Sequence, residues 1–324
     1  MFTVQDALAH YLDEVAASRS PNTYKAYRQA ADHFATLLAE HHLPPAETPI
    51  GQLSPDWMAW FIQHLRHVAV ATEQLYLTAL SGFYEHAAAE GWVEINLPAV
   101  RQLRRRRARR EATRLPEFPR EEIEAILDYV EMMAGSPVEE EGQQLRVLRD
   151  RALLFVLADT GMRVSEACGL TRGHLDWHEG RAIVLGKGNK EAVVRFSERS
   201  LRTLRAYLDA RAALDGVQGK PLGGLALFAR HDRAAGKRVL GISARSAEKI
   251  IERWAVAALG ESARGAITPH SFRHYFVTMV LRGSGGNIRM AQELARHKSI
   301  ATTERYTHLS DDELDRGYHE IFNV

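Results

Sequence analysis

One short segment divides the sequence, because its charge cannot be buried in a protein core. Residues 101–114, RQLRRRRARREATR, carry eight arginines against one glutamate, a local charge of +7. Of the 42 lysines and arginines these eight leave 34, against 40 remaining acidic residues, so the rest of the chain is net −6. Like charges at this density stay in solvent or meet a polyanion. The 324 residues suffice for a core on each side. We predict an N-terminal domain over 1–100, a linker over 101–114 and a C-terminal domain over 115–324.

The composition excludes several classes of protein. The N-terminus, MFTVQDALAHYLDE, lacks the basic and then apolar order of a signal peptide, and no apolar run approaches the ~20 residues of a membrane span. Cys168 is the only cysteine, which rules out a disulfide framework and a cysteine-based zinc cluster. We therefore expect a cytoplasmic protein without a membrane partner.

The first hundred residues are predicted to form four helices. Thr3 precedes one apolar stripe, and Ser20-Pro21 and Ser54-Pro55 each offer an N-cap followed by proline at the first helical position. A fourth helix, which includes Tyr76 and Phe83, is expected to end near Gly91. The aromatic residues on these helices are interpreted as core, so this domain is a compact helical one.

The C-terminal half mixes helices with one β-hairpin. The apolar helix RALLFVLADTG ends at Gly161, and a short helix, MRVSEACGL, follows it. The segments AIVL and AVVRF, separated by the turn GKGNK, predict a hairpin. Further helices are expected from about 198, 243, 269 and 287, and again from Glu304. The fold class is therefore mainly α with a small β-hairpin or sheet (α+β).

The stretch TPHSFRH, residues 268–274, predicts a helix start with unusual chemistry. Thr268 is a good N-cap, and Pro269 fits the first helical position. His270 and Arg273 are three residues apart and share one face of the first turns, where free N–H groups favour an anion. A charged, solvated helix start is the alternative interpretation.

Other segments of this half also carry side chains that could bind a phosphate or transfer a proton. Arg163 begins the short helix, Lys187 lies in the GKGNK turn, and the segment ARHKSIATTERYTH holds His297 and Tyr306. Each has an ordinary alternative. Arg163 can pair with Glu166 on its own helix, Lys187 can solubilise a turn, and His297 and Tyr306 can be core residues.

Taken in order, these segments resemble a known family. TGMRVSEACGL, GKGNKEAVV, HSFRH and LARHKSIATTERYTH are similar to the four catalytic boxes of the tyrosine site-specific recombinases, particularly bacterial Xer recombinases and phage integrases. The resemblance covers roughly residues 115–310. It implies a catalytic set around a scissile DNA phosphate, made of Arg163, Lys187, His270, Arg273, His297 and Tyr306.

The chemistry agrees with the roles that the resemblance implies. Tyr306 attacks the phosphodiester to give a 3′-phosphotyrosine, which keeps the bond energy for rejoining without metal or cofactor. Arg163 and Arg273 neutralise the charge that grows on the phosphate oxygens. His270 is the expected base and Lys187 the acid that protonates the leaving 5′-hydroxyl. His297 is expected to hydrogen-bond a phosphate oxygen.

One position departs from the family pattern. The family usually has glycine before the histidine that corresponds to His297, whereas this chain has Arg296 there and Lys298 after it. We predict that both extra cations contact the DNA backbone. The same contact is predicted for four arginines of the linker: Arg104, Arg105, Arg106 and Arg107.

The resemblance also implies partners and an assembly. We expect the two domains to form a C-shaped clamp on double-stranded DNA, and four subunits to act on two DNA sites, either as a homotetramer or with a paralogous recombinase. Residues 311–324 are expected to form a helix that docks on a neighbouring subunit or on its own domain. The target sequence, an activating protein, and a chromosomal, phage or transposon role are left open. Alternative functions are a type IB topoisomerase and a DNA-binding architectural protein without cleavage.

Overall fold

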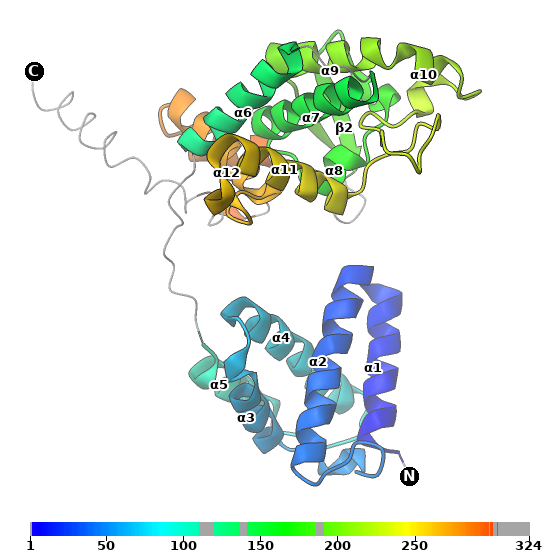
Figure 1. Cartoon of the computed structure of the whole chain (residues 1–324). Coiled ribbons are helices and arrows are strands. Elements are labelled where there is room, and N and C mark those ends of the chain that lie inside the picture. Colours follow the sequence, from blue (N-terminus) through cyan, green and yellow to red (C-terminus); the bar gives the residue numbers. More distant parts are fainter. Residues whose placement is uncertain are drawn as a thin grey trace, which may run out of the picture. The chain divides into compact units, whose positions relative to one another are not determined.

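The computed structural model describes residues 2–109, 120–136, 141–185, 191–297, 299–300 and 303. The chain divides into two compact units, Met1–Arg114 and Leu115–Val324 (Figure 1). Each has its own hydrophobic core. No described helix combines the length and apolar character that crossing a membrane requires.

Over residues 2–109, which the structure describes, the N-terminal unit is a bundle of five α-helices, one more than the sequence predicted. These are α1 (Val4–Ser18), α2 (Pro21–Glu40), α3 (Pro55–His64), α4 (Val70–Ala89) and α5 (Leu97–Arg107). The predicted caps are present: Ser20 accepts from the backbone N–H of Thr23, and Ser54 from that of Asp56. The aromatic side chains pack together as predicted, with Phe34, Phe61 and Phe83 each at most 1% exposed.

Helix α5 is the main difference from the sequence prediction in this unit. It extends into the segment expected to be a linker and packs on α3 and α4. Its anchor is Val100, which is 1% exposed. Because the last turn is all arginine, the helix lacks the apolar stripe by which a sequence pattern shows a helix.

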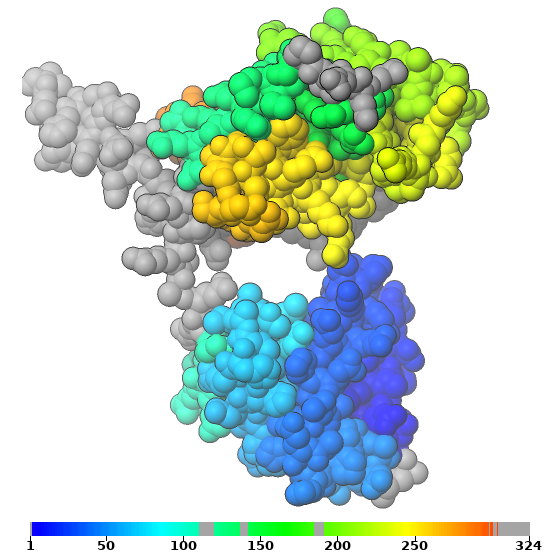
Figure 2. Space-filling model, viewed as in Figure 1, coloured from blue at the N-terminus to red at the C-terminus, as the bar shows by residue number. Residues whose placement is uncertain are grey.

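The C-terminal unit surrounds a small sheet with helices. Its helices are α6 (Arg120–Gly135), α7 (Glu141–Thr160), α8 (Val164–Cys168), α9 (Glu198–Ala210), α10 (Ala212–Gly216), α11 (Ala244–Leu259), α12 (Pro269–Gly283) and α13 (Ile288–Ala295). Helix α7 lies at the centre, against α6, α9 and α12, and its apolar residues from Ala152 to Ala158 are almost completely buried. On the face shown in Figure 2, α11 and α12 (yellow to orange) lie beside α6, which they contact.

The predicted hairpin is present and gains a third, very short strand. The strands β1 (Leu175–Asp176), β2 (Arg181–Leu185) and β3 (Glu191–Arg195) form an antiparallel sheet in that order. Ala182 faces Val194 in the register, and both are buried, whereas Ile183 faces Val193 on the exposed side. With mostly helices and one small sheet, the structure confirms the predicted fold class.

Gly161 sets how the chain passes from α7 to α8. Its φ of 56° lies in the left-handed region, which glycine adopts without strain. A Cβ at this position would clash with the ring of Phe276 on α12. The turn therefore brings the start of α8 close to α12, where the candidate site lies.

Candidate active site

The described candidate residues lie at the ends of three helices of the C-terminal unit. Arg163 is the N-cap of α8, His270 and Arg273 lie in the first turns of α12, and His297 follows the end of α13. These segments are far apart in the sequence, yet contacts join them. Arg273 donates to the carbonyls of Gly161 and Ala295, which lie two residues before Arg163 and His297. Glu166 on α8 pairs with both Arg163 and Arg296. The starts of α8 and α12 and the end of α13 therefore meet at one locus.

The start of α12 is built as the sequence predicted. Thr268 and Ser271 form a reciprocal capping box, in which the Ser271 hydroxyl accepts from the Thr268 N–H at 3.1 Å. Pro269 occupies the first helical position. The cap fixes the direction in which His270 and Arg273 leave the helix.

Arg273 is the buried member of the set, with 4% of the residue exposed. Its guanidinium donates to the carbonyl of Gly161 at the end of α7 and to that of Ala295 at the end of α13. Both carbonyls lie at helix ends, where no backbone partner is available. Arg273 therefore ties three helix ends together and carries a positive charge into the site.

Arg163 is the exposed member, and its ordinary alternative is confirmed. Its Nη1 lies 2.8 Å from Oε1 of Glu166, and its backbone N–H donates to Oε2 at 2.9 Å. The Arg163 side chain is nevertheless 48% exposed, while that of Glu166 is 7% exposed. The ion pair thus orients the guanidinium and leaves part of it open to solvent.

Burial and the neighbouring arginines keep the histidines neutral at pH 7. Burial, followed by the charges of Arg273 and Arg163, lowers the pKa of His297 to about 4. Desolvation and the same two arginines lower the pKa of His270 below its usual value. A neutral imidazole can take a proton, as the expected base requires. Nδ1 of His297 also lies 2.9 Å from Oγ1 of the buried Thr303, which orients the ring.

Arg296 has an unexpected conformation and partner. It ends α13 with φ 58° and ψ 43°, the left-handed conformation that glycine favours. Its Nη2 lies 2.9 Å from Oε2 of Glu166, and its side chain is only 13% exposed. The predicted contact of Arg296 with the DNA backbone stays a prediction, and here the guanidinium is turned toward a carboxylate of the same unit.

Three of the predicted residues lie outside the described residues. Lys187 falls in the hairpin turn, and Lys298 and Tyr306 lie beyond His297. Residues 311–324, predicted to form a docking helix, also lie outside the described part of the chain. Their roles stay predictions.

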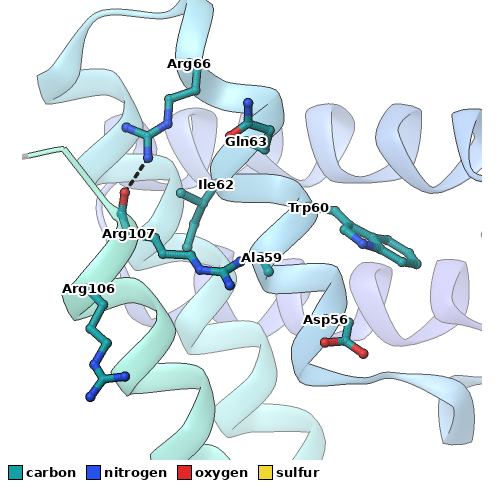
Figure 3. A pocket seen from close by; sticks show the side chains of 8 residues that line it. All are labelled: Asp56, Ala59, Trp60, Ile62, Gln63, Arg66, Arg106 and Arg107. Atoms are coloured by element: carbon teal, nitrogen blue, oxygen red, sulfur yellow. Dashed lines mark hydrogen bonds between the residues drawn. The ribbon is translucent and has the colours of Figure 1, made fainter.

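The arginines of α5 differ in their surroundings. Arg104 is partly buried and donates to Oγ1 of Thr78 on α4 at 2.7 Å, whereas Arg105, Arg106 and Arg107 are exposed. Figure 3 shows a pocket between α3 and α5, into which the Arg107 side chain points while its carbonyl accepts from Arg66. The exposed three are therefore the ones available to an external anion.

The last described residue before the gap in this segment, Arg109, is held inside the N-terminal unit. Its guanidinium and its backbone N–H both donate to the fully buried carboxylate of Glu73, the N–H at 2.8 Å. It also donates to the carbonyls of Leu65 and Val68. This arginine thus fixes the point at which the segment leaves the unit.

The sequence interpretation underrated two residues of the site. Glu166 entered only as an alternative partner of Arg163, and it now joins Arg163 to Arg296. His274, the last residue of the TPHSFRH stretch, packs edge-on against His270 at 4.6 Å between ring centroids, and burial lowers its pKa to about 4. The spacing of Arg163 and Glu166 signalled their own contact, but nothing local signalled that of Glu166 with Arg296.

Comparison with known proteins identifies the family. Residues 117–313 match the phage integrase family, and residues 3–102 match the phage integrase SAM-like domain. The chain is 32% identical to tyrosine recombinase XerC of Pelobacter propionicus over 94% of this chain and 90% of that protein. It is 29% identical to tyrosine recombinase XerD of Mycobacterium tuberculosis over 95% and 94% of the two chains.

The fold has a matching relative among solved structures. The XerH site-specific recombinase, solved as a post-cleavage complex with palindromic difH substrate, superposes with a TM-score of 0.69 at 19% identity. The match covers 91% of this chain and 79% of that one. With family matches across both units, the chain belongs to the phage integrase family of tyrosine recombinases, enzymes that cleave and rejoin DNA in site-specific recombination.

Proposed function

We propose that the C-terminal unit cleaves double-stranded DNA by transesterification at the locus where Arg163, His270, Arg273 and His297 meet. The observation that carries the proposal is the contact between three helix ends: Arg273 donates to the carbonyls of Gly161 and Ala295, and Glu166 pairs with both Arg163 and Arg296. Two arginines beside neutral imidazoles suit a phosphodiester, which is an anion throughout the reaction.

The proposed step balances in atoms and protons. The Tyr306 oxygen bonds to phosphorus, the bond from phosphorus to the 5′-oxygen breaks, and the phosphoryl group becomes a 3′-phosphotyrosine. His270 takes the phenol proton, and Lys187 gives a proton to the leaving 5′-hydroxyl. Arg163 and Arg273 neutralise the non-bridging oxygens, and His297 hydrogen-bonds one of them. Rejoining reverses these transfers with a 5′-hydroxyl of the partner strand.

The test is covalent capture on a nicked suicide duplex. A high-affinity site is first selected from fragments of the host chromosome's terminus region, and cleavage is run in EDTA. Denaturing gels should show a protein–DNA band for wild type and for the control Tyr129→Phe, whose partly buried ring lies on α6. Tyr306→Phe should give no band. Tight binding without a band in wild type, or a band that survives Tyr306→Phe, would overturn the proposed roles.

The proposal extends to the partners. The two units clamp opposite faces of a duplex, and the exposed arginines of α5 contact its phosphates. A DNA substrate and a single free cysteine favour action in the cytoplasm. In support, the XerH relative was solved with its DNA substrate bound.

Synapsis is proposed to join four subunits on two sites, with residues 311–324 as the docking segment. Removing them should leave the binding of one subunit to one half-site unchanged and abolish the complex that holds two duplexes. Gel-shift assays with one and with two labelled duplexes separate these outcomes. A truncated chain that still pairs two duplexes would refute the docking role.

A further inference from the structure

Arg296 adopts a left-handed backbone conformation, which is strained for arginine but not for glycine. Of the described non-glycine residues, only His42 and Arg296 have a positive φ. The left-handed conformation brings Cβ too close to the backbone, so an L-residue adopts it only where its surroundings hold it there. The strained residue lies directly before His297.

The ion pair with Glu166 stabilises this conformation of Arg296. Nη2 of Arg296 lies 2.9 Å from Oε2 of Glu166, with 13% and 7% of the two side chains exposed. At this burial, water screens the attraction far less than at the surface. Among the described residues neither Nε nor Nη2 of Arg296 has a hydrogen-bond partner, so the contact with Glu166 is an attraction between charges and not a two-pronged hydrogen bond.

The pair connects three candidate catalytic residues. The Glu166 carboxylate also accepts hydrogen bonds from the side chain and from the backbone N–H of Arg163. On the other side, Arg296 lies between Ala295, whose carbonyl accepts from Arg273, and His297. The end of α13 and the start of α8 are thus joined beside the site, through a single buried carboxylate.

We propose that Arg296 is a positioning residue for DNA cleavage, which fixes His297 relative to Arg163 through Glu166. Where a glycine would relax the backbone at the helix end, this chain pins the same backbone with a buried charge pair. The inference rests on the proposed function of the site. It assigns Arg296 to the interior of the C-terminal unit in place of the DNA contact predicted from sequence.

The test separates cleavage from binding in the full-length protein. Arg296→Met keeps the length of the side chain and removes its charge, Arg296→Lys keeps the charge, and Arg289→Met is the control. Arg289 lies on the same helix with its side chain 84% exposed. We expect Arg296→Met to lower the single-turnover cleavage rate about 10-fold, with Kd and its salt slope unchanged. Lysine should restore part of the rate, and the control should cleave like wild type.

Two further variants exclude a merely structural effect. Arg296→Gly relieves the backbone strain, so its unfolding midpoint in urea should stay near that of wild type while cleavage still falls. In the double variant with Glu166→Gln, Arg296→Met should add little to the loss caused by Glu166→Gln alone, because both remove the same contact. A glycine variant that cleaves as fast as wild type would refute the inference.

Other outcomes distinguish this inference from the proposed function. A weaker Kd with a salt slope reduced by about 0.9 would assign Arg296 to a DNA phosphate instead. Absence of cleavage in wild type would count against the proposed function alone. The inference is then decided by NMR of the His297 ring without DNA. Its resonances should shift in Arg296→Met and not in Arg289→Met, and an unchanged ring in both would overturn the positioning role.

Discussion

Replacing Arg273 tests whether the site is held together by the residue that also serves the chemistry. In Arg273→Ala, the carbonyls of Gly161 and Ala295 both lose their guanidinium partner inside a buried region. A buried carbonyl left without a partner costs about 1–3 kcal/mol, so the two together cost about 2–6 kcal/mol of unfolding free energy. Arg273→Lys presents one compact ammonium in place of the fork, so about half of that loss is expected.

The expected stability loss is large compared with that of an exposed arginine. Arg289→Ala breaks an exposed i,i+4 pair with Glu293, for which about 0.5 kcal/mol is expected. Arg273→Ala should also lower the cleavage rate by about 10²–10³, because one contact to the phosphate is lost. The lysine variant keeps the charge and should lose less of the rate.

The measurement is urea unfolding monitored by hydrogen exchange. Peptides from α7 and α12 report the unfolding transition of the C-terminal unit. The two units need not unfold together, so one midpoint for the whole chain would not report on this site. If Arg273→Ala unfolds within about 1 kcal/mol of wild type, the reasoning that its two carbonyl contacts hold the helix ends is wrong.

Three further predictions concern other parts of the molecule. Burial, followed by nearby arginines, lowers the pKa of His231 to about 4, so between pH 6.5 and 4 the unfolded chain binds more protons than the folded one. The unfolding free energy should therefore fall as the pH is lowered through this window. In His231→Gln, the urea midpoint should depend less on pH over the same range. Replacing the exposed Arg105 and Arg106 by alanine should reduce the salt slope of DNA binding, measured by anisotropy, by about 0.9 per lost contact. Glu73→Gln should cost about 3–5 kcal/mol in urea unfolding, because Glu73 is the buried partner of Arg109; a loss below about 1 kcal/mol would count against that pairing.

Local signals in the sequence predicted most of the helix starts. Ser20-Pro21, Ser54-Pro55 and Thr268-Pro269 each combine a cap with a favourable first residue, and all three begin helices here. Helix α5 was missed because its last turn consists of arginines, so the sequence shows no apolar stripe there. Packing on α3 and α4 stabilises the helix instead. Strand β1 was missed because two residues are too few to show an alternation.

Local motifs indicated a candidate set of residues, but not how these residues are arranged. Arg163, His270, Arg273 and His297 stay predicted site residues, and the structure joins the helix ends that carry them. Their degrees of burial, and the pairing of residue 296 with residue 166, depend on how α8, α12 and α13 pack. Contacts between residues so far apart leave no periodic trace in one sequence, so they could not be predicted from it.

The crowded turn at Gly161 has a practical consequence for anyone who wishes to redirect this enzyme to a new target sequence. Any other amino acid there would strain the backbone at its φ of 56° and press on the ring of Phe276, which lies on α12, the helix that carries His270 and Arg273. In a mutant library that varies this codon, most clones would be inactive, whatever DNA sequence the variants recognised. Keeping Gly161 fixed, and varying exposed positions away from the candidate site, would avoid this disturbance of the helix that carries His270 and Arg273.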